Sequence, residues 1–207
     1  MINVIKDIDL FFEVDKYDVI LLASNIYCMI GNGFQRKVSR HYLYVYEGNL
    51  RTKYGDIDKL GSMMECSQEN NPTFTLLYIT KGYEKKKKGE RNDFLNYDAL
   101  KNCLEQVNER YKGKKIASTL LGCSPFDGNG DKDNVLKIMS DVLTDVNVDV
   151  FDYHQKTKED EIYENMNIDI QLKKTDYSKY REVYGKRKKE EQDIMKRQRE
   201  MLDKIII

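Results

Sequence analysis

The chain has 207 residues, and its 35 basic and 35 acidic side chains leave no formal net charge. This balance argues against a general nucleic-acid coat or a polybasic membrane surface, although it is compatible with a local charged patch. Charged residues make up 34% of the chain, which exceeds the ~25% usual in globular domains. The location of this excess is therefore the first question.

Five short runs rich in apolar and β-branched residues predict strands, at residues 2–5, 19–23, 74–80, 115–119 and 146–151. Apolar residues at helical spacing predict helices between them, at residues 32–46, 97–111 and 133–143. Strands that alternate with helices indicate parallel βαβ units covered on both faces. We therefore predict an α/β fold of three layers.

The composition changes at about residue 153. Beyond it, 14 basic and 12 acidic residues fall within 54 positions. We expect a domain at residues 1–153 and a charged, largely helical C-terminal extension at 154–207. A narrow apolar stripe along its strongest helical segment leaves three uses open: packing on its own domain, formation of a homodimer, or contact with nucleic acid.

The cysteines and the N-terminus indicate the compartment. The four cysteines are dispersed and none forms a C-x-x-C pair, and with only two histidines we expect no metal site. The first residues lack the basic and apolar regions of a signal peptide, and no apolar stretch approaches the ~20 residues that cross a bilayer. These features predict a cytoplasmic protein without a membrane partner.

Two loops that contain glycine follow predicted strands and lead into predicted helices, at residues 24–34 and 121–131. At the carboxyl ends of parallel strands, such turns and the helix N-termini after them present backbone N–H groups to phosphate. Turns of this kind are also common as purely structural features, so each loop alone is weak support. Two of them on neighbouring strands would enclose a diphosphate.

The order of several segments resembles the macrodomain family. These segments are ASN followed by GNGF and a helix, a strand that ends in YITKGY, the run KIASTLLGCSPFDGNG, and VDVFDY. The sequence looks closest to the branch of terminal ADP-ribose protein glycohydrolase and of phage and bacterial ADP-ribose-1″-phosphate phosphatases. The resemblance covers residues 1 to about 153. It implies a three-layer α/β/α macrodomain-like mixed sheet with a cleft for ADP-ribose and no cofactor.

The resemblance also implies which residues bind the ligand. Asp9, followed by Leu10, would accept a hydrogen bond from the adenine amino group, Asn25 would contact the distal ribose, and adenine would stack on Phe151. The turn beside that ribose and the diphosphate corresponds to Gly31, Asn32, Gly33 and Phe34, and the second phosphate loop to Gly122, Cys123, Ser124, Phe126 and Gly128. Each of these residues also has a purely structural alternative role: Asp9 as the cap of a turn, Asn25 as an Asx-turn residue, and Phe151 as a core aromatic residue.

In the glycohydrolase branch, a lysine after the central strand attacks C1″ of the ring-opened ribose, and an acidic residue in the second loop assists. Lys81 and Asp127 occupy these places. A lysine attacks only as the free amine, and Asp127 would protonate the leaving group or activate water. The alternatives are a surface lysine at a strand end and a helix-capping or turn aspartate.

Three departures from the family pattern bear on function. Residues 124–126 lengthen the second loop and remove glycine from it, Leu22 lies in the region where phosphatase relatives carry a histidine, and a basic segment is inserted at 83–91. The insertion is either a solvated loop or an attractor of a polyanionic ligand such as nucleic-acid-linked ADP-ribose. The first hypothesis is an enzyme that hydrolyses an ADP-ribose linkage. The alternatives are a non-catalytic binder of ADP-ribose or a related nucleotide, and an ADP-ribose-1″-phosphate phosphatase.

Overall fold

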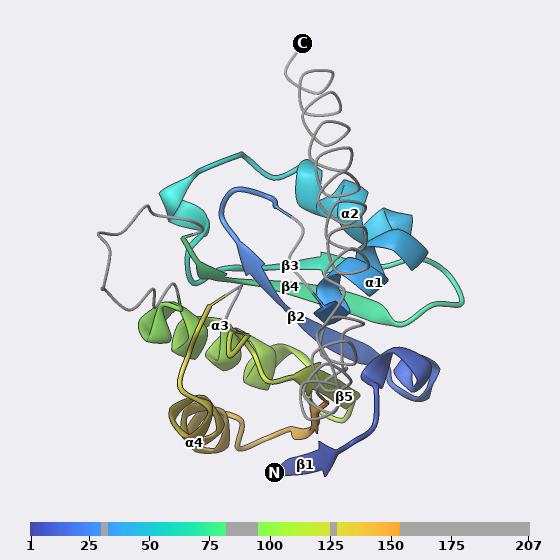
Figure 1. Ribbon diagram of the computed structural model, residues 1–207, viewed down its shortest axis with the longest axis vertical. Helices are drawn as coiled ribbons and strands as arrows, with labels where there is room; N and C mark the ends of the chain where they lie inside the picture. Colours follow the sequence, from blue (N-terminus) through green and yellow to red (C-terminus); the bar gives the residue numbers. More distant parts are fainter. Residues whose placement is uncertain (30–32, 82–94, 125–127, 154–207) are drawn as a thin grey trace, which may run out of the picture. The chain divides into compact units, whose positions relative to one another are not determined.

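The computed structural model describes residues 1–29, 33–81, 95–124 and 128–153 (Figure 1). Residues Met1–His154 form one compact unit. The predicted C-terminal extension at 154–207 and the basic segment at 83–91 lie outside the described residues.

The described chain forms a mixed six-stranded sheet in the order β1-β6-β5-β2-β4-β3. Every pair of neighbouring strands is parallel except β3 and β4, so the predicted α/β fold is confirmed. The strands are β1 (Ile2–Lys6), β2 (Val19–Asn25), β3 (Met63–Cys66), β4 (Thr73–Thr80), β5 (Lys115–Thr119) and β6 (Asn147–Asp152). The α-helices are α1 (Gly33–His41), α2 (Leu43–Leu50), α3 (Tyr97–Arg110) and α4 (Lys132–Val142), and short 3₁₀ turns form η1 (Leu10–Phe12), η2 (Val14–Lys16) and η3 (Ile57–Lys59).

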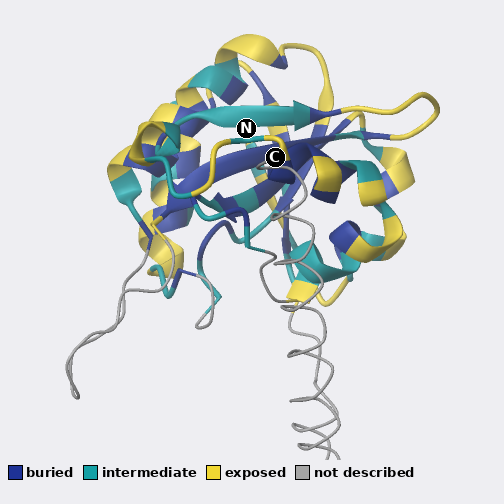
Figure 2. Ribbon diagram, turned by 90° about the horizontal axis from the view of Figure 1, so that it is seen from above, coloured by how far each residue is buried: buried dark blue, intermediate teal, exposed yellow. Residues whose placement is uncertain are grey.

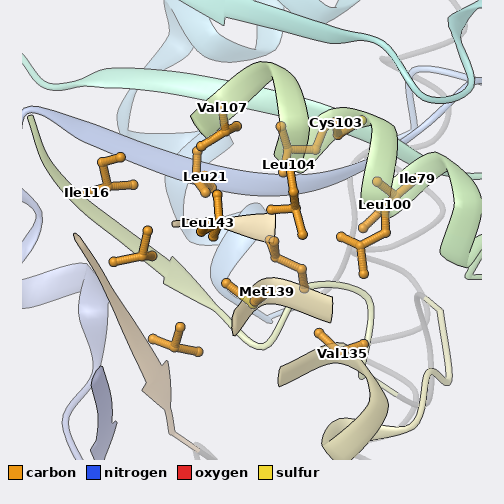
Figure 3. Packing of buried hydrophobic residues seen from close by; sticks show 14 of the residues in the cluster. Leu21, Ile79, Leu100, Cys103, Leu104, Val107, Ile116, Val135, Met139 and Leu143 are labelled. Carbon is orange, nitrogen blue, oxygen red and sulfur yellow. The ribbon is translucent and has the colours of Figure 1, made fainter. Parts of the chain in front are cut away.

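The central strands are buried on both faces, because helices cover the sheet on either side (Figures 1 and 2). Side chains alternate along a strand, so successive residues of β2 enter different cores. Leu21 packs with α3 and α4 in the larger core, and Ile20 and Leu22 pack with α1 and α2 in the other. Figure 3 shows the larger core, where Leu104 and Met139 meet the sheet. This two-sided burial explains why β2 and β4 are nearly continuous apolar runs.

Side-chain caps fix the start of two helices. The Asn96 side chain accepts from the backbone N–H of Ala99 at the start of α3, and the Asp131 side chain accepts from Asn134 at the start of α4. Each cap satisfies an N–H group that has no partner within the helix. The loop after β5 therefore ends at a defined residue.

Two elements differ from the prediction. The helix expected at residues 32–46 is two helices, because the backbone leaves the helical region at Tyr42, whose ring packs 4.8 Å from that of Phe74. The sequence analysis also missed β3, a four-residue edge strand that pairs antiparallel to β4. None of the helices in the described ranges is long and apolar enough to cross a membrane.

Candidate functional site

The carboxyl ends of the five parallel strands lie at one edge of the sheet, and the loops after them carry the predicted site. β2 and β5 are direct neighbours, as the sequence analysis required for its two loops. The chain leaves β2 toward the face covered by α1 and leaves β5 toward the face covered by α4. Connections that diverge in this way create a topological switch point, where open α/β sheets bind ligands.

Asn25 organises the first loop. Its side-chain oxygen accepts from the backbone N–H groups of Tyr27 and Met29, both at 3.1 Å, and its amide nitrogen donates to the carbonyl oxygen of Met29 at 2.9 Å. This is the Asx-turn alternative of the sequence analysis. Asn25 therefore fixes the path of the backbone as it leaves β2.

Glycines in the second loop allow backbone to pack against backbone. A Cβ atom on Gly128 would lie 2.2 Å from the carbonyl oxygen of Gly122, and one on Gly130 would lie 2.4 Å from the Leu95 side chain. The Gly122 oxygen also accepts from the N–H of Gly130 at 2.9 Å, and Gly122 itself has a φ of 69°. Close packing within the loop thus accounts for these glycines without a ligand.

Asp9 caps the short turn η1 and forms an ion pair. Its Oδ1 accepts from the backbone N–H of Phe11 at 3.0 Å, and its Oδ2 accepts from the Lys37 ammonium group on α1. The turn-capping alternative is therefore observed, together with a lysine partner that the sequence analysis missed. The neighbouring Leu10 side chain is 1% exposed and packs in the core, so a ligand contact from Leu10 would come from its backbone.

Two of the three predicted aromatic site residues, Phe151 and Phe34, lie among the described residues, and both pack against the core. Phe151 is 3% exposed and packs edge-on against the ring of Tyr17, with ring centroids 6.0 Å apart. This burial favours the core-aromatic alternative, because the ring presents no open face for adenine to stack on. Phe34 on α1 is half-buried and packs against the same core, whereas Gly33 before it is exposed with a φ of 56°.

Lys81 directly follows β4 and is exposed. The preceding Thr80 pairs with Asn25 in the sheet, and its carbonyl oxygen accepts from Ile26 at 3.2 Å. Lys81 therefore begins its loop beside the first loop. The remaining predicted site residues, Gly31, Asn32, Phe126 and the candidate acid Asp127, lie outside the described residues.

Cys123 and Ser124 belong to the described part of the second loop, and both are half-buried. Burial raises the pKa of the Cys123 thiol to about 11, so this thiol is protonated at neutral pH and is a poor nucleophile. In the part of the chain that the structure describes, no group of three His, Cys, Asp or Glu side chains could hold a metal ion.

The residues between α2 and β3 that hold the first loop in place were not predicted from the sequence. Lys59 in η3 donates to the carbonyl oxygen of Ile26, and the N–H of Gly55 donates to the same atom at 2.9 Å. The only sequence signal for this segment is the Gly55-Asp56 turn, which does not indicate where the segment packs.

No protein-family model and no curated protein matches this sequence. Several solved structures share its fold. A protein from Bacteroides thetaiotaomicron aligns at 20% identity and a TM-score of 0.60, over 73% of this chain and 99% of that one. The macrodomain of Mycobacterium tuberculosis DarG aligns at 15% identity and a TM-score of 0.55, over 73% of this chain and 97% of that one. This chain has the macrodomain fold.

A further macrodomain-fold neighbour was solved with a ligand. Thermosipho africanus DarTG in complex with ADP-ribose aligns at 16% identity and a TM-score of 0.55. The alignment covers 75% of this chain and 42% of the DarTG chain. The likeness concerns the arrangement of strands and helices, because at these identities side-chain chemistry does not transfer.

Proposed function

We propose that this macrodomain-fold protein binds ADP-ribose between the loops after β2 and β5. The observation that carries the proposal is the switch point between these neighbouring parallel strands, where each strand is followed by a glycine-containing loop and a helix N-terminus. Backbone N–H groups and helix dipoles at such a place favour a diphosphate. Support also comes from a neighbour of the same fold, Thermosipho africanus DarTG, whose structure contains ADP-ribose.

We further propose that the bound ligand is the ADP-ribose part of a modified substrate, whose linkage the protein hydrolyses. Lys81 follows the strand next to β2 and so begins within reach of the same edge of the sheet. Its free amine would attack C1″ of the distal ribose and form a C–N bond as the bond from C1″ to the substrate breaks. Asp127 would pass a proton to the leaving group and take up the proton that the amine loses. Water would then hydrolyse the C1″–lysine bond, which releases ADP-ribose and restores the free amine.

A non-catalytic binder is the second candidate, because Lys81 is exposed. In water a lysine is almost entirely protonated at neutral pH, and a catalytic amine usually needs burial or a neighbouring cation to lose its proton. A domain that only recognises or sequesters ADP-ribose needs no free amine.

Isothermal titration with ADP-ribose, followed by chromatography of the incubated ligand, tests binding. Release of ADP-ribose from ADP-ribosylated protein or nucleic acid tests hydrolysis, and ADP-ribose-1″-phosphate as a third ligand tests phosphatase activity. Under the enzyme hypothesis, Lys81→Ala and Asp127→Ala each slow release by about 10²–10⁴-fold. Lys112→Ala, which removes a lysine paired with Asp145 at the opposite edge of the sheet, serves as the matched control.

Binding without turnover supports the second candidate. Unchanged release in both active-site variants contradicts the proposed mechanism, and failure of the wild-type protein to bind ADP-ribose contradicts both candidates.

A further inference from the structure

The segment between α2 and β3 packs against the loop that leaves β2. The rings of Tyr27 in the loop and Tyr54 in the segment meet edge-on, with centroids 5.4 Å apart. The backbone N–H of Gly55 donates to the carbonyl oxygen of Ile26 at 2.9 Å. The first loop therefore rests on a chain segment about thirty residues further along.

Lys59 is the charged member of this contact. Its Nζ donates to Thr52 Oγ1 at 2.7 Å, to the Ile26 carbonyl oxygen at 3.1 Å and to the Cys28 thiol sulfur at 3.2 Å. The same nitrogen lies 4.4 Å from the centre of the Tyr78 ring, in a cation–π contact. None of the three acceptors belongs to a carboxylate, so the ammonium donors are satisfied without an ion pair.

No carboxylate among the described residues forms an ion pair with Lys59. The nearby Asp56 is paired with Lys53, with the oxygen and nitrogen 3.1 Å apart. Lys59 is half-buried, and the Asp56 carboxylate, whose pKa is lowered chiefly by its hydrogen bond to Lys53, also lies in the field of the Lys59 charge without pairing with it. Such a cation stabilises an anion that arrives nearby, because its field is only partly screened by solvent.

The loop that Lys59 holds has an unusual backbone. Cys28 has a φ of 54°, a left-handed conformation that few residues other than glycine adopt. Such a conformation persists when surrounding contacts hold it. Two of the three hydrogen bonds of Lys59 reach this loop, one at Ile26 and one at Cys28 itself.

We infer that Lys59 is a positioning residue for an anionic ligand: it fixes the loop after β2 and holds beside it a positive charge that forms no ion pair with a described carboxylate. This inference rests on the proposed function, in which that loop faces the diphosphate of ADP-ribose. The ligand class that it selects is a nucleoside diphosphate derivative rather than an uncharged nucleoside.

The test compares variants of the full-length protein by titration with ADP-ribose at low and high NaCl. Lys59→Met removes the charge and retains the apolar stem over Tyr78, Lys59→Gln removes the charge but retains a donor, and Lys59→Arg retains the charge. Lys112→Gln removes a charge from the Lys112–Asp145 pair at the opposite edge of the sheet and serves as the control. Thermal unfolding followed by circular dichroism shows that each variant is folded.

We expect Lys59→Met and Lys59→Gln to weaken ADP-ribose binding about tenfold, which corresponds to about 1.4 kcal/mol, and to reduce its dependence on salt. The affinity of Lys59→Arg for ADP-ribose should stay within about threefold of the wild-type value, and Lys112→Gln should bind ADP-ribose as tightly as wild type. If Lys59→Met does not fold, Lys59→Gln carries the test.

Equal losses in the Gln and Arg variants, with an unchanged salt dependence, would overturn the inference because they indicate a role in packing only. Unchanged affinity in Lys59→Gln would overturn it as well. Both outcomes leave the proposed function intact, since the wild-type protein still binds. A wild-type protein that does not bind ADP-ribose at all refutes the proposed function, and this inference with it.

Discussion

Substitution of Gly128 by alanine is the sharpest structural test of the second loop. The new Cβ would lie 2.2 Å from the carbonyl oxygen of Gly122 and 2.9 Å from its carbonyl carbon. Both are backbone atoms, so the overlap cannot be relieved by turning a side chain. The loop has to open by about 1 Å, which strains or breaks the 2.9 Å hydrogen bond from Gly130 to Gly122.

The expected cost combines two effects. Forcing an extra carbon into a packed site typically costs about 1–3 kcal/mol, and the lost hydrogen bond adds about 1 kcal/mol. We therefore expect Gly128→Ala to lower the free energy of unfolding by about 2–4 kcal/mol, measured by urea denaturation, and the melting temperature by about 5–15 °C. If the loop also binds the diphosphate, affinity for ADP-ribose falls in the variant that remains folded.

Gly113→Ala is the matched control. Gly113 has a φ of 76°, but a Cβ there meets no atom within 4 Å. Its cost is backbone strain alone, about 1 kcal/mol. A Gly128→Ala protein within about 0.5 kcal/mol of wild type would refute the steric reasoning, because that is the range in which substitutions at ordinary surface positions usually fall.

Three further predictions concern single side chains. Ser118→Ala should leave stability unchanged or raise it by up to about 1 kcal/mol in chemical denaturation, because this buried hydroxyl has no hydrogen-bond partner among the described residues. Asn25→Ala should cost about 2 kcal/mol and weaken ADP-ribose binding at least tenfold by titration, because three loop hydrogen bonds are lost. The Arg110 guanidinium lowers the pKa of the Glu65 carboxyl, so this ion pair stabilises the fold above the ordinary carboxyl pKa and the stabilisation is lost as the pH falls through the lower folded-state value. For this half-exposed pair we expect the free energy of unfolding of wild type to exceed that of Glu65→Gln by about 0.5–1 kcal/mol at pH 7. This difference in stability should vanish near pH 3.

Each of these predictions has a control. Thr75→Val removes a buried hydroxyl that is hydrogen-bonded to Tyr111 at 2.6 Å, and it should cost about 1–2 kcal/mol where Ser118→Ala costs nothing. Asn25→Asp retains the acceptor for both N–H groups, so it should lose less stability and less affinity for ADP-ribose than Asn25→Ala. A stability difference between wild type and Glu65→Gln that does not depend on pH would contradict the ion-pair explanation.

Local patterns predicted the elements that dominate the fold. The strands around Leu21 and Ile79 are buried on both faces, and such strands are recognisable as short apolar runs between turns. Leu100, Leu104 and Val107 repeat at helical spacing, so α3 was predicted nearly to its bounds. Because the carboxyl ends of parallel strands share an edge of the sheet, the sequence also predicted that the two glycine-containing loops lie close to one another.

The candidate site was only partly accessible in this way. The sequence offered two roles each for Asp9, Asn25 and Phe151, and the structure shows the structural contact for all three: local turn hydrogen bonds for Asp9 and Asn25, and core packing for Phe151. Asp9 meets Lys37 from a helix 28 residues away, and Phe151 is covered by Tyr17 from across the chain. A single residue type does not specify such partners.

The amino-acid sequence by itself determined the alternation of strands and helices and the position of both glycine-containing loops, because burial on two faces and the start of each helix leave local signals. Only the tertiary structure decided what holds those loops: within the second loop the Gly122 carbonyl packs against Gly128, and Lys59 contacts Cys28 in the first. The contact within the second loop depends on how the backbone folds back on itself. The place of Lys59 beside the first loop depends on long-range packing, which periodicity does not encode.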